Sequence, residues 1–119
     1  MKNYHGIIVD ISQQDKSIFD KLKILGSKKS SSGWILYKIE VSPEEINKII
    51  EQLQQNMVVE PFYCHFYRDN ELVVVFKERV FRVTSDKYTW DEAVEYGKSL
   101  GIPEEQLDFF PCKVGEETY

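Results

Sequence analysis

The chain of 119 residues has no long apolar run, few cysteines and few basic residues relative to acidic ones. No stretch approaches the roughly 20 consecutive apolar residues that a membrane-spanning helix needs, so we expect no membrane partner. The first residues, MKNYHGIIVDISQQDK, contain too short an apolar run for a secretory leader, which predicts a cytoplasmic protein. In that compartment the two cysteines, Cys64 and Cys112, are expected to stay reduced.

Lys and Arg together number 15 against 20 Asp and Glu, which gives a formal net charge of −5. This charge opposes the electrostatic attraction on which nucleic-acid binding depends, so nucleic acid is disfavoured as a partner. Hydrophobic residues make up 42% of the chain, enough for a folded core, and the length suits one compact domain rather than two. The sequence therefore predicts a single domain over residues 1–119, with 112–119 as a frayed tail.

Residues that carry catalysis are also scarce. The only histidines are His5 and His65, and neither lies in a recognisable Ser, Cys or carboxylate motif. Cys64 is adjacent to His65, but neighbours in a strand point to opposite faces and cannot form a nucleophile and base pair without a bulge. The histidines and cysteines also lack clustered zinc spacing. We therefore expect no catalytic residue, no metal site and no cofactor.

The only low-complexity segment is Gly26–Gly33, with the sequence GSKKSSSG, and it is predicted to be a loop. It fails the phosphate-binding P-loop pattern because Ser32 stands where that pattern requires lysine. Backbone amides near Lys28, Lys29 and Ser30 could still hold an anion, since short Ser and Gly runs can form such sites. The alternative is a solvated connector.

The clearest strand signal is Phe62–Thr84, FYCHFYRDNELVVVFKERVFRVT, which predicts three strands joined by two-residue turns at 69–70 and 77–78. Asn70 is expected to take the positive φ of the first turn, whereas the second turn has no Gly or Asn. This register gives one apolar face and one mixed face. We expect helices to cover the apolar face, which comprises Phe62, Cys64, Phe66, Val73, Val75 and Val80.

Segments before this meander predict two more strands and a short helix. Tyr4–Ile11 is expected to be a strand buried on both faces near the middle of the sheet. Gly6 within it marks a bulge or a close backbone approach. Asp15–Leu25 shows helical spacing of its apolar residues and predicts a short helix with Ser17 as N-cap, while 34–41 alternates as a strand.

Two capping patterns predict longer helices. Ser42 as N-cap, Pro43 at the first helical position and Glu45 at the third indicate a helix that begins at Pro43. A second capping box at 89–92 opens a helix that continues to residue 100 and ends at Gly101. The apolar stripe of the first helix must face the sheet and comprises Ile46, Ile49, Ile50, Leu53 and Met57.

Together these elements predict an α+β domain with a mixed, largely antiparallel sheet of about five strands and helices mainly on one face. A right-handed crossover would make strands 34–41 and 62–68 parallel, which is the ferredoxin-like pattern extended by one strand. The phrases YCHFYRDNELVVVF and EYGKSLGIPEEQLDF resemble those of an uncharacterised family of small prokaryotic proteins. This resemblance implies no activity.

The candidate site is the mixed face of the meander. Tyr63, His65 and Tyr67 occupy alternate positions of one strand, with Arg79 and Phe81 nearby. Four uses remain open: a second core layer, a homodimer contact, a small-molecule or peptide site, and an RNA-stacking surface that the negative charge disfavours. We expect a non-catalytic soluble binding or interaction domain, and the alternative is a small enzyme with a pocket centred on His65.

Overall fold

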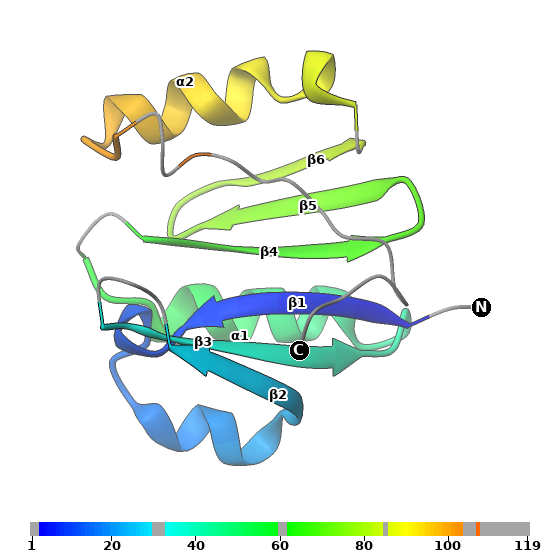
Figure 1. Ribbon diagram of the computed structural model, residues 1–119, viewed down its shortest axis with the longest axis vertical. Coiled ribbons are helices and arrows are strands. Elements are labelled where there is room, and N and C mark those ends of the chain that lie inside the picture. Colours follow the sequence, from blue (N-terminus) through cyan, green and yellow to red (C-terminus); the bar gives the residue numbers. More distant parts are fainter. Residues whose placement is uncertain (1–2, 30–32, 60–61, 85, 104–106, 108–119) are drawn as a thin grey trace.

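The computed structural model describes residues 3–29, 33–59, 62–84, 86–103 and 107 as an α+β domain, so the predicted class is confirmed (Figure 1). The strands are β1 (Tyr4–Val9), β2 (Lys23–Lys29), β3 (Ile35–Val41), β4 (Tyr63–Arg68), β5 (Glu71–Phe76) and β6 (Val80–Thr84). The helices are α1 (Ile46–Asn56) and α2 (Asp91–Ser99), with short 3-10 helices η1 (Asp10–Ser12), η2 (Lys16–Lys21) and η3 (Lys87–Thr89). Within these residues, neither α-helix has the length and apolar character needed to cross a bilayer.

The strands form one sheet in the order β2-β3-β1-β4-β5-β6 (Figure 1). β1 lies between β3 and β4 and is antiparallel to both, so β3 and β4 run in the same direction on either side of it. The predicted central position of the first strand and the predicted parallel orientation of strands 34–41 and 62–68 are thus confirmed. The sheet differs from the prediction in having six strands, with every described pair of neighbours antiparallel.

The predicted pairing of the meander is confirmed. Arg68 lies opposite Glu71 and His65 opposite Val74, and across the second turn Val74 lies opposite Phe81. The positive φ of the first turn falls on Asp69 (52°), not on Asn70 as predicted. Asp and Asn both tolerate this conformation, so composition alone did not decide between them.

β2 corrects two predictions, since Lys23–Lys29 is neither the end of a helix nor part of a loop. It pairs with β3 along its whole length, with a register shift between Ile24 and Gly26. Pairing satisfies backbone groups that β3 would otherwise expose at an edge. Helical structure is confined to η2, and its cap is Asp15, whose side chain accepts a hydrogen bond from the backbone N–H of Ser17 (2.9 Å).

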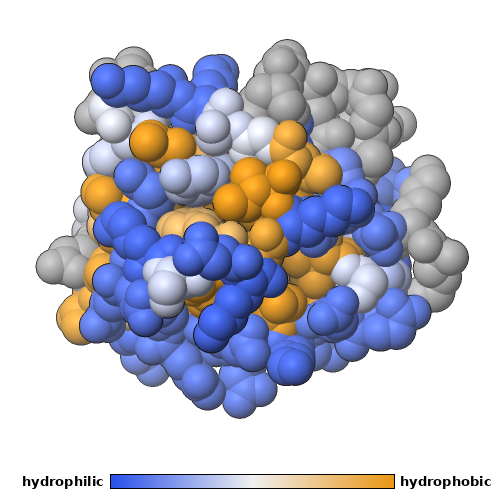
Figure 2. All heavy atoms as spheres, turned by 90° about the horizontal axis from the view of Figure 1, so that it is seen from below, coloured by the Kyte–Doolittle hydropathy of each residue, from blue (hydrophilic) through white to orange (hydrophobic). Residues whose placement is uncertain are grey.

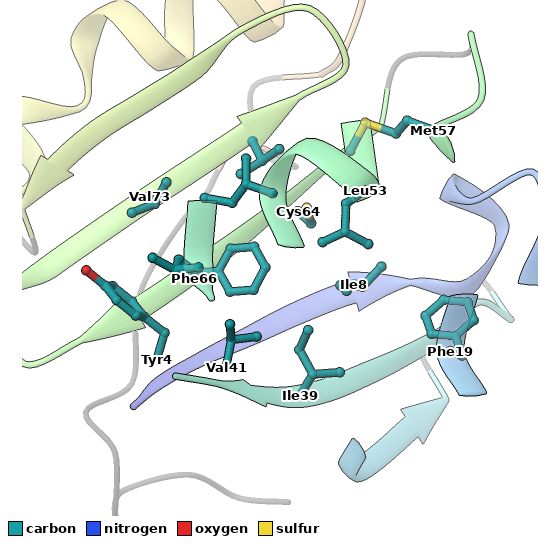
Figure 3. Packing of buried hydrophobic residues seen from close by; sticks show 13 residues of the cluster. Tyr4, Ile8, Phe19, Ile39, Val41, Leu53, Met57, Cys64, Phe66 and Val73 are labelled. Atoms are coloured by element: carbon teal, nitrogen blue, oxygen red, sulfur yellow. The ribbon is translucent and has the colours of Figure 1, made fainter. Parts of the chain in front are cut away.

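α1 covers the face that was predicted to be apolar (Figure 3). Four residues of its predicted stripe are almost fully buried, which stabilises the fold by about 6 to 12 kcal/mol before chain entropy is counted. These residues are Ile46, Ile50, Leu53 and Met57, and Ile49 packs beside them partly buried. The helix begins at Ile46 rather than Pro43, because Glu45 N–H donates to the Ser42 carbonyl (3.0 Å) and closes a separate turn.

α2 packs against the opposite face, so the prediction that helices lie mainly on one face is wrong for this helix. Buried Trp90 and Ala93 cluster with the side chains of Leu72, Val74 and Phe76, which alternate with those that face α1. Thr89, the predicted N-cap, lies in η3 instead, where its hydroxyl donates to the Asp86 carbonyl (2.6 Å). Gly101 ends the helix with a φ of 92°, as predicted.

Candidate functional site

The structure places the three ring residues of β4 on the side of the sheet that α2 covers. Tyr67 is buried, with 3% of its surface exposed, while Tyr63 and His65 are half-buried. Leu72, directly opposite Tyr67, is fully buried. Most of this face is therefore a second core layer, which was one of the four uses left open by the sequence.

Rings on this face form a continuous series of contacts. His5 of β1 meets Tyr67 edge-on with ring centroids 6.1 Å apart, Tyr67 lies 6.1 Å from His65, and His65 lies 6.5 Å from Tyr63. We call these four residues the aromatic row. The row runs from β1 along β4, and its half-buried members are Tyr63 and His65.

Arg79 and Phe81 do not join the exposed part of the row. Phe81 is only 7% exposed and its ring contacts that of Phe76, with centroids 5.9 Å apart. Tyr96 of α2 covers both phenylalanines at 4.9 and 5.6 Å. The Arg79 guanidinium lies 4.7 Å from the Phe81 ring centroid, at the rim of this cluster. The packing of α2 thus separates the predicted site into a buried part and an accessible part. The sequence did not reveal on which face of the sheet this helix packs.

Sequence reasoning missed the charged end of the row. His5 Nε2 lies 3.3 Å from Glu40 Oε2, and Lys23 Nζ lies 2.7 Å from Glu40 Oε1. The hydrogen bond from Lys23 lowers the pKa of the Glu40 carboxyl against the opposing effect of burial. The fully paired strands β1 and β3 bring His5 opposite Glu40 and Ile7 opposite Lys38, a buried lysine. No local motif signals this arrangement, since its members come from three strands.

The predicted opposite orientation of the adjacent side chains of Cys64 and His65 is confirmed. Cys64 is 1% exposed among the side chains that face α1, on the other side of the sheet from His65. Burial raises the pKa of its thiol to about 12, so the reactive thiolate is not formed near neutral pH. Cys112 lies outside the described residues.

The two lysines of the predicted anion loop lie in β2 and are exposed. Lys28 pairs with Leu36 and Lys29 with Ile35, so their side chains point to opposite faces of the sheet and do not converge on one anion. Ser30 lies outside the described residues. This arrangement does not favour an anion site here.

The described part of the chain gives little support for a metal site or for an enzyme pocket. No group of three His, Cys, Asp or Glu side chains converges there in a way that could hold a metal ion. Cavities of about 610, 300 and 610 Å³ are lined by residues other than His65 and its ring neighbours. None of these three cavities is thus a pocket centred on His65.

No family model, curated protein or solved structure matches this chain.

Proposed function

We propose that the protein is a non-catalytic binding or interaction domain whose contact surface is the half-buried part of the aromatic row, Tyr63 and His65. The observation that carries this proposal is their setting: two amphipathic rings stand side by side on a strand that is paired on both sides. Tyrosine supplies a large contact area at low entropic cost and is enriched at interfaces. A rigid strand holds the two rings ready for a partner.

The alternative, a small enzyme, has one feature in its favour. His5 and Glu40 form an imidazole and carboxylate pair of the kind that acid–base catalysis uses. However, His5 is only 8% exposed, and the second carboxylate oxygen of Glu40 accepts a hydrogen bond from Lys23. These contacts favour a structural link between β1, β2 and β3, so we favour binding over catalysis.

Two occupants suit the proposed surface. A second copy of the chain would place Tyr63 and His65 at a homodimer contact, where tyrosine often contributes a large part of the binding free energy. A small molecule or peptide with a flat apolar group would stack on the same rings.

The test combines solution mass with a ligand screen. Light scattering of the full chain gives the oligomeric state, and amide chemical shifts during a screen of aromatic small molecules locate any bound compound. We expect either a dimer or shifts at β4, and we expect Tyr63→Ala and His65→Ala to weaken the association at least tenfold while the protein still melts cooperatively.

Tyr88→Ala is the matched control, because Tyr88 is 90% exposed and lies in η3, away from the aromatic row. Its association should equal that of the wild type. A monomer whose β4 amides respond to no compound, or association that survives both ring substitutions, would remove the aromatic row as the contact surface.

A further inference from the structure

The two edge strands of the sheet, β2 and β6, differ in how they are protected. β2 carries Lys23, Lys28 and Lys29, and its register shifts near Ile24. Lysines and bulges are the usual means by which edge strands avoid pairing with other chains. Figure 2 shows the side where β2 and η2 lie, and hydrophilic residues there surround smaller hydrophobic areas. β2 is thus protected against strand addition.

Antiparallel pairing with β5 determines which residues of β6 turn their backbone N–H and C=O groups toward the outer edge. Phe76 N–H donates to the Arg79 carbonyl (2.8 Å), which makes this a hydrogen-bonded pair. Because such pairs alternate with non-hydrogen-bonded ones, every second residue of β6 turns its N–H and C=O away from β5. These residues are Val80, Arg82 and Thr84.

Contacts within the chain already occupy one of these three positions. Thr84 N–H donates to the Thr89 hydroxyl (3.1 Å), and the Thr84 carbonyl accepts a hydrogen bond from Trp90 Nε1 (2.7 Å). Both contacts confirm that the backbone of Thr84 points outward. They also end the available edge at Thr84, so the open part consists of Val80 and Arg82.

A cleft of about 610 Å³ adjoins this open edge, and 71–73 of β5 contribute to its lining. The whole of 79–84 lines it, and Thr89 and Glu92 line it from the side of η3 and α2. An added strand would lie about 4.8 Å from β6, so it needs space beside the backbone of the kind that this cleft provides.

Charge at the cleft favours an acidic occupant. Arg82 is exposed and donates to Asn47 Oδ1 (2.6 Å), a neutral partner, and Arg79 lies over aromatic rings. Among the ion pairs of the described residues, neither arginine has a carboxylate partner. Glu71, which also lines the cleft, forms an ion pair with Arg68 (2.7 Å). Among the described residues that line the cleft, Glu92 is thus the one carboxylate outside an ion pair, against two arginines.

We propose that the β6 edge binds an extended acidic segment of a partner protein by strand addition. The segment forms up to four backbone hydrogen bonds with Val80 and Arg82 and places a carboxylate near the Arg82 guanidinium. A second copy of the chain fits less well. Two β6 strands paired about a two-fold axis at Phe81 would place Arg82 opposite Val80 of the other copy, with the two Arg82 side chains as diagonal neighbours on one face, where like charges repel.

A displayed library of random ten-residue peptides, selected on the full-length protein, is the probe. We expect the retained peptides to be enriched in Asp and Glu, and a synthetic copy of one should slow exchange of the Val80 and Arg82 amides at least tenfold. Arg82→Glu should weaken its binding at least tenfold.

Two variants control for charge and for the local contact. Lys28→Glu makes the same change in charge at the β2 edge, and Asn47→Ala removes the hydrogen bond to Arg82 without changing charge; both should bind within about twofold of wild type. The proposal is overturned if no peptide is retained, if neutral or basic peptides are selected, if protection appears elsewhere, or if Lys28→Glu weakens binding as much as Arg82→Glu. Self-association through β6, seen as a doubled mass that Arg82→Glu abolishes, also overturns it.

Discussion

At the scale of single residues, Lys77 explains why a turn with a weak sequence signal is well formed. Its ammonium group donates to the carbonyls of Met57 (2.6 Å) and Gln54 (3.3 Å) at the end of α1. Gln54 Nε2 in turn donates to the Phe76 carbonyl (2.8 Å) at the start of the turn. A cation at the negative end of a helix is stabilising. The turn is thus fixed by a helix some 20 residues earlier, which no local pattern reveals.

Lys77→Met should therefore lower the free energy of unfolding by about 1 to 2 kcal/mol, because the carbonyl groups at the end of α1 lose a charged donor. Urea unfolding followed by circular dichroism measures this change. Glu78→Gln is the control in the same turn, since Glu78 is exposed and should change stability by less than about 0.5 kcal/mol. Equal stability of Lys77→Met and wild type would show that the contact contributes nothing.

Cys64 predicts a dependence of stability on alkaline pH. Burial raises the pKa of its thiol from 9.0 to about 12. Between these values the unfolded chain releases the proton and the folded chain retains it, so the free energy of unfolding falls as pH rises, by up to about 1.4 kcal/mol per pH unit. Well below pH 9 both states are protonated and this contribution is constant.

The measurement is urea unfolding at several pH values from 8 to 10.5 for wild type and Cys64→Ala. The alanine variant is less stable throughout because it leaves a cavity, but it lacks the thiol, so its stability should fall less steeply above pH 9. Parallel pH profiles for the two proteins would show that the thiol is not buried as described.

At the scale of elements, the sequence predicts those whose side chains repeat with a clear period. The stripe of α1 and the pairing of β4, β5 and β6 are confirmed because apolar side chains there recur at helical or strand spacing. β2 is missed because Leu22 and Leu25 continue the helical spacing that begins at Ile18 and Phe19. The pairing with β3 makes this segment a strand, and tertiary contacts of this kind override local propensity.

Ile50→Asp tests the role of α1. Ile50 is 5% exposed and faces the sheet, so aspartate there would place an unpaired charge in the core and should unfold the domain at room temperature. Far-UV circular dichroism during heating detects the loss of the cooperative transition. Gln52→Asp is the matched control, because Gln52 is exposed on the same helix. A normal melt of Ile50→Asp would contradict the packing of α1 on the sheet.

At the scale of the whole molecule, the sequence did not show that both faces of the sheet are covered. The apolar face and its helix were predicted, but the mixed face could equally have been exposed or packed. The ring of Tyr96 on α2 contacts that of Phe81 on β6, so this face is packed. The sequence could not show this contact, because the orientation of the helix relative to the strand depends on the connection between them. Only Tyr63, His65 and the rim residue Arg79 therefore remain accessible from the predicted site.

The position of β1 also determines the order in which the sheet can form during synthesis. β1 leaves the ribosome first, yet its two partners, β3 and β4, are separated from it by later segments of the chain. The β2-β3-β1 half can assemble once Val41 has emerged, and one side of β1 then stays without a partner until Arg68 follows. A nascent chain arrested near Asn56 would thus present an apolar strand with an open edge. We expect such a chain to be a substrate for ribosome-associated chaperones, and release from them to follow the emergence of β4.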